Sequence, residues 1–592
     1  MDSIIFTNKA QCQDCNRCVR KCPVKAIKVE NAQASVDANK CIHCGTCIRE
    51  CPQQAKHYRR DVYKAKELLT GESKVAVSFA PSFAGIYDKW QWHRLPSALR
   101  KLGFDYIAET STGAFFSAKA TKEEYVNSKS SQIATACPAI VSYIEKYKPE
   151  KVSNLVKIVS PMIAHAKYLK ELFATKGEEV KVVFIGPCTA KKAEAEREEF
   201  AGLVDVALTF QELDEWLIDE GIKYEELEES NFDEKAPDIA KLFPLMGGLI
   251  KTAEMDADIH SYNIINVSGI NEITEAFDLI DSTPDTDFLI DPLFCSQGCL
   301  NGPGIDTKYN IFERRRHLLQ YKNDAESIDC PTSGYDIDYR TEFNTEIGIN
   351  TNKFTEAEIA QVLSKTGEAD HTKRLNCGAC GYDSCREKAI AVLEGMAETE
   401  MCLPYVRRIA ESRKNKLFET TPNGVVILDY RYNIINMNPA FRKFFICSQS
   451  IVGKPISYLM DPEPFVKLVA DETDQVMELT VKHDNYNVVC HQILYKLPEE
   501  SLIVGIFVNI TKNVADNTQL TELREKTISQ AQELLNHQID MAQNFAKLLG
   551  ETAARGEALV DNLMKMSQDQ NSNDNNSNRK NGNWLWDIYT TK

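Results

Sequence analysis

The clearest chemistry in this sequence is that of its 19 cysteines, which occur in groups. Two groups near the N-terminus share the spacing C-x2-C-x2-C-x3-C-P. Soft thiolates at this spacing bind iron–sulfur clusters, and the fourth cysteine of each group crosses to the other cluster. We therefore predict two [4Fe–4S] clusters, with zinc sites as the alternative. The first would use Cys12, Cys15, Cys18 and Cys51, and the second Cys41, Cys44, Cys47 and Cys22.

Residues 1–60, which hold both groups, resemble a bacterial two-cluster ferredoxin. They carry 11 Lys/Arg and 5 Asp/Glu, whereas the whole chain has a net charge of −17. The acidic total argues against general binding to nucleic acid. The basic segment offsets the negative charge of the clusters, and it leaves either a docking face for an acidic redox partner or an ordinary solvated surface.

Four further cysteines are widely separated in the middle of the chain, at Cys137, Cys188, Cys295 and Cys299. Strand-like runs such as 75–79 and 180–185 alternate with helical stretches from 74 to about 340, which predicts α/β units around a mainly parallel sheet. Ligands of such folds bind at the carboxyl ends of the strands. The four thiols can therefore close one more cubane, with unreactive structural thiols as the alternative.

The motifs T-A-C-P, G-P-C-T-A-K-K-A-E and C-S-Q-G-C-L-N-G-P-G surround these cysteines. In this order, after a ferredoxin-like segment, they resemble the catalytic domain of [FeFe]-hydrogenases over roughly residues 1–320. The resemblance implies that the four cysteines hold the cubane of an H-cluster, which Cys299 bridges to a diiron unit carrying CO, cyanide and an azadithiolate. It also implies that Lys191 donates to one cyanide and that Pro81 and Ser82 line the pocket of the other. An ordinary surface lysine is the alternative for Lys191.

The sequence departs from that family at the positions that move protons. Ala136 stands where the family usually has a relaying cysteine, and a methyl group cannot exchange a proton. Gly186 and Leu293 stand where methionines are usual, and Met162 where a cyanide-contacting glutamine is common. Loss of a relay lowers a rate by about 10²–10⁴-fold. We therefore predict an iron hydrogenase (H2:acceptor oxidoreductase) of low turnover or an H2 sensor.

A fourth set of cysteines, Cys377, Cys380, Cys385 and Cys402, has the spacing C-x2-C-x4-C-x16-C. It resembles the small four-cysteine iron–sulfur domain of corrinoid iron–sulfur proteins and sensory hydrogenases, with a helix expected over 386–400 and zinc as the alternative. These sets predict four [4Fe–4S] clusters in total. The other three cysteines, Cys330, Cys447 and Cys490, are expected to be unreactive buried thiols.

Residues 416–511 resemble a PAS domain, with five antiparallel strands and short helices. His491 there is expected to be structural rather than a haem ligand. Apolar residues from Ile528 to Ala553 step by three and four, which predicts a dimerisation or signalling helix. Residues 567–583 are rich in Asn and Ser and are expected to be disordered.

The elements that must position these sites give a multidomain α/β and α+β fold class. No apolar run is long enough to span a bilayer and no export signal is seen, which predicts a cytoplasmic protein. The predicted parts are a ferredoxin domain (1–60), an H-cluster domain (61–345), a four-cysteine domain (346–410), a PAS domain (411–511), a helix (512–568) and a disordered tail (569–592).

Together these features predict a sensory [FeFe]-hydrogenase that binds or slowly oxidises H2 and relays its redox state through the clusters to the PAS domain. The implied partners are H2, a ferredoxin-like electron carrier, diiron maturation proteins, a regulatory phosphatase or kinase acting in trans and a second copy of the chain, but no nucleic acid and no membrane. Two alternatives stay open. One is a slow ferredoxin-linked hydrogenase without a sensory role, and the other a non-catalytic relative with cubanes but no diiron unit.

Overall fold

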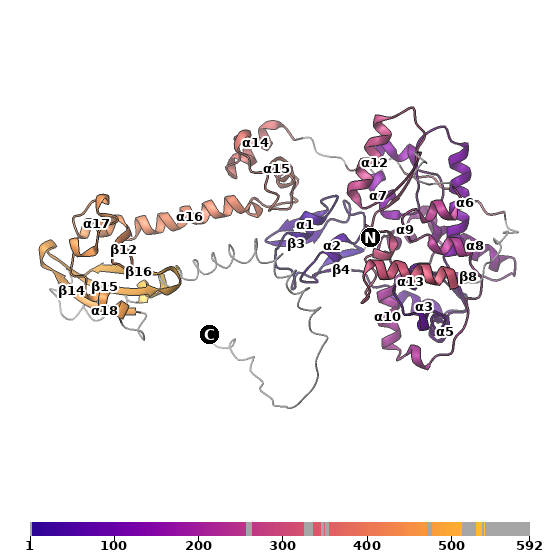
Figure 1. Ribbon diagram of the computed structural model, residues 1–592, viewed down its shortest axis with the longest axis horizontal. Coiled ribbons are helices and arrows are strands. Elements are labelled where there is room, and N and C mark those ends of the chain that lie inside the picture. The colour runs from indigo at the N-terminus through magenta and orange to yellow at the C-terminus, as the bar shows by residue number, and fades with distance from the viewer. Residues whose placement is uncertain are drawn as a thin grey trace. The chain divides into compact units, whose positions relative to one another are not determined.

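The computed structural model describes residues 3–255, 263–324, 336–344, 349, 354–470, 476–511, 529–534 and 538. The chain divides into two compact units, Met1–Ile409 and Ala410–Lys592, each with its own apolar core (Figure 1). Among the described residues, no helix combines the length and the apolarity needed to cross a membrane.

Of the N-terminal cysteines, Cys18 and Cys47 lie on two short helices, and the others lie in the loops before and after these helices. Strand β1 (Ile5–Thr7) pairs antiparallel with β4 (Lys56–Tyr58), and β2 (Ile27–Glu30) pairs antiparallel with β3 (Gln33–Val36). Helices α1 (Arg17–Lys21) and α2 (Thr46–Arg49) each begin after a residue in the left-handed region, at Asn16 and Gly45. These sharp entries let three thiols of each group face one point.

The middle of the first unit contains two parallel sheets. One has the order β6-β5-β8-β9, from Tyr106–Glu109, Lys74–Phe79, Val180–Gly186 and Val206–Thr209. The other has the order β10-β11-β7, from Ile264–Ser268, Leu289–Leu293 and Gln132–Ile133. The predicted parallel α/β architecture is therefore confirmed.

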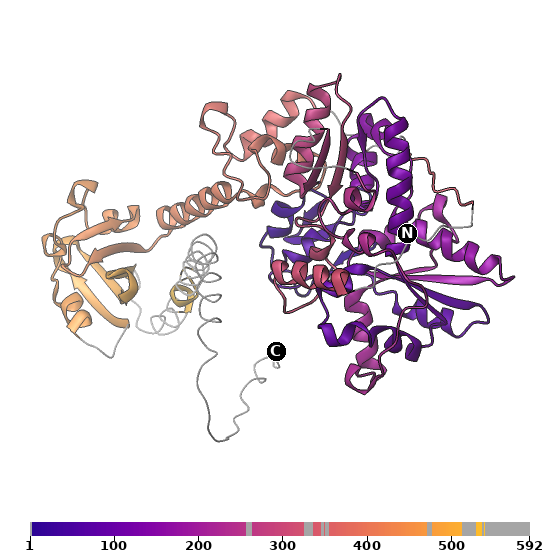
Figure 2. The same cartoon turned by 45° about the vertical axis from the view of Figure 1, so that its right-hand side comes forward.

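Helices pack against these sheets and cover their apolar strands (Figure 2). The helices up to the second sheet are α3 (Val62–Leu69), α4 (Lys89–Trp92), α5 (Leu95–Leu102), α6 (Ser111–Asn127), α7 (Pro138–Tyr147), α8 (Pro161–Ala174), α9 (Ala190–Ala195), α10 (Phe210–Asp219) and α11 (Gly248–Thr252). Those that follow are α12 (Ile270–Ser282) and α13 (Ile311–Asp324). Helices α14 (Glu356–Lys365) and α15 (Cys385–Leu393) instead pack against each other around a small apolar cluster of their own.

The second unit contains one antiparallel sheet of five strands, as predicted. Its order is β13-β12-β16-β15-β14, from Ile434–Met437, Gly424–Asp429, Leu502–Asn509, Val488–Leu497 and Val476–His483. Helix α16 (Leu403–Thr420) precedes it, and α17 (Pro439–Phe444) and α18 (Glu463–Ala470) belong to its core. His491 lies within β15 with Nδ1 3.3 Å from Thr480 Oγ1, which favours the expected structural role.

The three cysteines outside the four sets differ in burial. Cys490 is fully buried, as expected, but Cys447 is only half-buried, because it follows the exposed Ile446 at the end of α17. Cys330 and the Asn-rich tail lie outside the described residues, as does most of the predicted helix from Ile528 to Ala553. Of that helix, residues 529–534 are described and are helical.

A buried charge cluster ties α9 to the end of the cysteine-rich segment. Lys192 Nζ donates to Asp61 Oδ2 at 3.0 Å, to Glu212 Oε1 at 3.0 Å and to the carbonyl of Ala207 at 2.9 Å. The side chains of Lys192, Asp61 and Glu212 are at most 3% exposed. Burial raises the pKa of Asp61, but hydrogen bonds from Arg59 and the charge of Lys192 outweigh it, so this pKa is lowered overall.

We expect Lys192→Met to lower the free energy of unfolding by about 3–5 kcal/mol, because it removes the cation that pairs with the buried Glu212 carboxylate and one of the three cations that pair with Asp61. The contribution of Asp61 is present above its unfolded pKa and is lost as pH falls through its lowered folded pKa. The difference in the free energy of unfolding between Lys192→Met and the parent chain should therefore become smaller at acidic pH. Urea unfolding at several pH values measures it. The control Lys66→Met removes an exposed partner of Glu220 and should change stability by less than about 1 kcal/mol; equal effects would contradict the expectation.

Candidate functional site

The N-terminal thiols lie near one another in groups. Burial and the thiols of Cys15 and Cys12 raise the pKa of Cys18, which groups these three residues, and Cys51 as their fourth partner stays a prediction. Burial raises the pKa of Cys22 to about 11 and that of Cys41 to about 12, and the Cys44 thiol adds to both. Burial also raises the pKa of Cys47, with added effects of Cys44, Cys41 and Cys22. Cys22 is thus grouped with the second set. Iron binding by these residues stays a prediction.

Backbone N–H groups already point at several of these sulfurs. Ala26 N lies 3.2 Å from Cys22 Sγ, His43 N 3.3 Å from Cys41 Sγ, and Ala55 N 3.2 Å from Cys51 Sγ. Donors at this distance favour a thiolate over a thiol. The loops are therefore arranged to carry negative charge on sulfur, as cluster ligands must.

The four distant cysteines line a single cavity of about 780 Å³, part of it open to solvent. Cys137 follows β7, Cys188 follows β8, and Cys295 and Cys299 follow β11. The other walls come from residues that follow β5 and β6. The cavity therefore lies at the carboxyl ends of five parallel strands, where the fold class places ligands.

The thiols in this cavity need a positive group to ionise. Burial raises the pKa of Cys188 to about 12, and Cys137 adds to it while Lys191 lowers it. Burial likewise raises the pKa of Cys299, with added effects of Cys137 and Cys188. Among the described residues, no three His, Cys, Asp or Glu side chains are placed to hold a single metal ion.

Most predicted neighbours of the cofactor line the same cavity, namely Pro81, Ser82, Ala136, Met162, Lys191 and Leu293. Gly186 does not. A Cβ at Gly186 would lie 2.5 Å from the ring of Phe184, a side chain that does line the cavity. Phe184 therefore fills the space that a larger residue at 186 would occupy, and Gly186 acts through packing rather than contact.

Two polar groups on the wall fit an anionic, hydrogen-bond-accepting cofactor. Ser82 is 1% exposed, and its Oγ has no hydrogen-bond partner among the described residues. A buried hydroxyl of this kind needs an acceptor or a donor. Lys191 Nζ donates to Ser160 Oγ at 2.8 Å and to Glu194 Oε2 at 2.7 Å, and the third hydrogen of this ammonium group is left for the cavity.

Glu194 is a site residue that sequence reasoning missed. It is 6% exposed and pairs with Lys191 three residues earlier on α9. The i,i+3 spacing within G-P-C-T-A-K-K-A-E was the available signal. The pair shows that Lys191 is buried rather than an ordinary surface lysine, and that its charge is balanced by protein before any cofactor binds.

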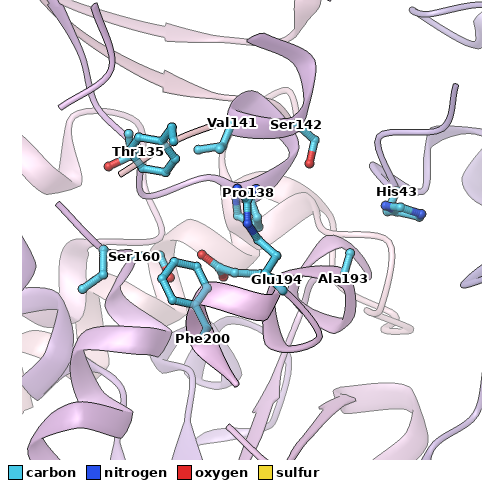
Figure 3. Close-up of a pocket in the computed structure, with 12 residues that line it drawn as sticks. His43, Thr135, Pro138, Val141, Ser142, Ser160, Ala193, Glu194 and Phe200 are labelled. Carbon is cyan, nitrogen blue, oxygen red and sulfur yellow. The ribbon is translucent and has the colours of Figure 1, made fainter. Parts of the chain in front are cut away.

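A second, smaller cavity of about 480 Å³ lies behind this pair (Figure 3). Ser160 and Glu194 lie close together on one side of it, with His43 apart from them. Burial and the charge of Lys146 lower the pKa of His43 to about 4, so its ring is neutral at pH 7. Pro138 lines both cavities.

The loop of the second cysteine group touches the loops of the large cavity. Thr189 Oγ1, next to Cys188, donates to the carbonyl of His43 at 2.7 Å. A Cβ on Gly45 would lie 2.3 Å from Pro303 Cβ. The chain at Gly45 therefore packs closely against Thr189 and Pro303, which neighbour the cavity-lining residues Cys188 and Gly302.

The C-terminal set of four cysteines also lines one cavity, of about 420 Å³, with Lys388 at its wall. Burial lowers the pKa of Lys388, while the thiols of Cys402 and Cys380 raise it. Helix α15 ends at Leu393 rather than near residue 400, because Gly395 takes a positive φ of 70° and turns the chain back. Without that turn Cys402 could not return to the other three.

This four-cysteine region is docked on the N-terminal segment. Lys25 Nζ donates to the carbonyl of Gly381 at 2.8 Å, and the N–H groups of Asn31 and Ala32 donate to the Glu398 carboxylate at 2.6 and 3.3 Å. A Cβ on Gly381 would lie 2.9 Å from Arg20 N. The shared apolar core contains Cys18, Val19, Cys22, Tyr382, Ala391 and Met396.

Comparison with known families agrees with these sites. Residues 73–303 match the C-terminal domain of the iron only hydrogenase large subunit, and residues 4–61 match a 4Fe-4S dicluster domain. Residues 374–404 match an Fe-S cluster family, and residues 412–476 match the PAS domain. The chain is therefore a hydrogenase-like iron–sulfur protein with a PAS domain.

The curated relatives include enzymes and assembly factors. Iron hydrogenase 1 of Clostridium pasteurianum is 25% identical over 257 residues, which cover 36% of this chain and 45% of that protein. NADP-reducing hydrogenase subunit HndD of Solidesulfovibrio fructosivorans is 29% identical over 182 residues (27% and 31%). Cytosolic Fe-S cluster assembly factor NAR1 of Yarrowia lipolytica is 31% identical over 156 residues (24% and 32%). The chain thus spans less than half the length of each.

Among solved structures, an [FeFe]-hydrogenase is 18% identical, with 45% of this chain and 91% of that chain covered and a TM-score of 0.39. This overall similarity is too low to support a conclusion about activity.

Proposed function

We propose that this chain is a cytoplasmic, sensory-type [FeFe]-hydrogenase that binds or slowly oxidises H2 at an H-cluster. Cys137, Cys188, Cys295 and Cys299 hold the cubane, and Cys299 bridges it to the diiron unit. The bound cofactor supplies the H2 chemistry. Lys191 and Ser82 offer hydrogen-bond donors to it, and Pro81, Met162 and Leu293 exclude water from its surroundings.

The observation that carries this proposal is the cavity itself. Four thiols, the Lys191 ammonium group and the buried Ser82 hydroxyl, which has no hydrogen-bond partner among the described residues, line one cavity at the strand ends. No apolar packing reason gathers these groups. Ala136, which lines the same space without a titratable group, accounts for slow turnover.

Redox state is proposed to pass from this cavity through the two N-terminal clusters to the four-cysteine cluster, and on to the PAS domain. The contact of Thr189 with His43 supports the transfer from the cavity to the N-terminal segment, and that of Gly381 with Arg20 supports the transfer from this segment to the four-cysteine cluster. The proposed output acts in trans, through a phosphatase or kinase and a second copy of the chain. A ferredoxin-like carrier supplies or removes electrons, and maturation proteins install the diiron unit.

The docked contacts give this relay a direct test. We expect the double variant Lys25→Ala/Glu398→Ala to weaken docking by about 2 kcal/mol, a factor of about 30 in the docking equilibrium. Reduction of the four-cysteine cluster after addition of H2 should slow, as followed by freeze-quench EPR, with Cys380→Ala identifying its signal. The control Lys28→Ala/Glu30→Ala removes an exposed pair of the neighbouring strand β2. Unchanged kinetics in the docking variant would argue against this route.

Similarity to the NAR1 assembly factor favours a second candidate, a non-catalytic iron–sulfur protein whose large cavity binds a cubane alone. The two candidates differ in the diiron unit. CO and cyanide absorb in the infrared where protein does not, so the spectrum of the matured chain separates them.

A further inference from the structure

A row of hydrogen-bonded side chains leaves the cavity on the wall that Ala136 shares. Thr110 lines the cavity, and its Oγ1 lies 2.8 Å from Ser78 Oγ. Ser78 Oγ lies 2.7 Å from His165 Nδ1, and His165 Nε2 lies 3.2 Å from Glu234 Oε1. Ala114, one helical turn after Thr110, lines the same cavity and shares an apolar cluster with Ala136.

This Thr110–Glu234 row runs from a buried residue that lines the cavity to a side chain that is partly exposed to solvent. Ser78 and His165 are fully buried, Thr110 is 4% exposed, and the side chain of Glu234 is 11% exposed. The residues on either side of Glu234 are exposed. Ser78 comes from β5, Thr110 follows β6, His165 lies on α8, and Glu234 lies on the loop before residue 238. Four separate elements therefore converge to make one path.

The partners fix the direction in which the hydrogens point. A carboxylate only accepts, so His165 Nε2 carries the hydrogen that faces Glu234, and in the neutral ring Nδ1 is then an acceptor. Ser78 must donate to Nδ1, which leaves its oxygen to accept from Thr110. Thr112 Oγ1 also donates to Glu234 Oε1, at 2.6 Å, and holds the carboxylate in place. Every hydrogen in the row therefore points away from the cavity.

We propose that the Thr110–Glu234 row is the proton path of this chain, in place of the thiol missing at Ala136; this rests on the function proposed above. A proton from the cavity binds Thr110 Oγ1 as the Thr110 hydrogen passes to Ser78 Oγ. The Ser78 hydrogen passes to His165 Nδ1, and the hydrogen on Nε2 passes to Glu234. One O–H or N–H bond forms for each that breaks, and no electron moves. Glu234 then releases the proton to water.

The test compares alanine substitutions at two buried serines, one inside the Thr110–Glu234 row and one outside it. Ser78→Ala breaks the row, whereas Ser117→Ala removes another buried hydroxyl, one that donates to the carbonyl of Val159 at 2.9 Å. In the full chain loaded with its diiron unit, exchange of H2 with D2O should fall about 10²-fold in Ser78→Ala and stay unchanged in Ser117→Ala. If the Ser78→Ala chain does not take up the diiron unit, the exchange rate is measured in Thr110→Val instead, a variant that breaks the row and keeps the side-chain shape.

A second readout does not depend on activity. In the full chain without its diiron unit, ¹⁵N-histidine NMR should show His165 as the Nε2–H tautomer with Nδ1 hydrogen-bonded, assigned by the loss of its signals in His165→Phe. Ser78→Ala should shift the Nδ1 signal toward that of an unbonded nitrogen. The Nδ1–H tautomer in the parent chain would overturn the proposal.

The outcomes separate this proposal from the function on which it rests. A parent chain with CO and cyanide bands that respond to H2, but with equal exchange rates in Ser78→Ala and Ser117→Ala, overturns the relay alone. A matured parent chain without these bands overturns both.

Discussion

We expect the Ala136→Cys chain to turn over H2 about 10²-fold faster than the parent. Ala136 lines the cavity at the residue before Cys137, on the wall that also carries Thr110. A thiol there would offer a group that exchanges protons between the cofactor and that wall, and such a group contributes about 10²–10⁴-fold. The rate of H2 oxidation with an artificial electron acceptor measures the gain.

Ala118→Cys is the matched control for this substitution. Ala118 is fully buried in the same apolar cluster as Ala136 but does not line the cavity. A thiol there should leave the rate unchanged. An Ala136→Cys chain with normal CO and cyanide bands and an unchanged rate would show that proton transfer is not what limits turnover.

The largest loss is expected for Cys299→Ala. Cys299 lies in the same cavity as the other three thiols, and the proposal gives it the link to the diiron unit. Without this thiolate the matured chain should lack CO and cyanide bands and any response to H2, while the N-terminal and four-cysteine clusters still form. Infrared spectroscopy and EPR on one sample measure the two parts separately.

Cys490→Ala serves as the control here, because Cys490 is fully buried in the core of the second unit. This variant should lose stability and keep both bands and H2 response. CO and cyanide bands that survive in Cys299→Ala would contradict the proposed role of Cys299 as the link to the diiron unit.

Much of this architecture could be predicted from local patterns. The apolar runs at 75–79 and 180–185 correspond to β5 and β8, which pair in parallel. The spacing of the C-terminal cysteines anticipated the thiols of the smaller cysteine cavity, and the motifs around the four distant cysteines anticipated those of the large one. Such features follow from short-range periodicity and from metal-ligand spacing.

What could not be predicted depends on contacts between distant segments. In the sequence, His165 is a polar residue in an apolar stretch of helix, with no sign of its partners. Only the fold places it between Ser78 and Glu234. The docking of Glu398 on Asn31 and Ala32 joins residues more than 360 positions apart. No spacing rule encodes these pairs, because each residue alone looks like an ordinary buried or surface group.

The central claim is that the large cavity holds a diiron cofactor that responds to H2. Infrared spectroscopy of the full chain, matured with a diiron unit and then exposed to H2, tests it most directly. We expect CO and cyanide bands that shift under H2 and recover when H2 is removed. A chain with its iron–sulfur clusters complete but no such bands, or with bands that H2 leaves unchanged, would contradict it.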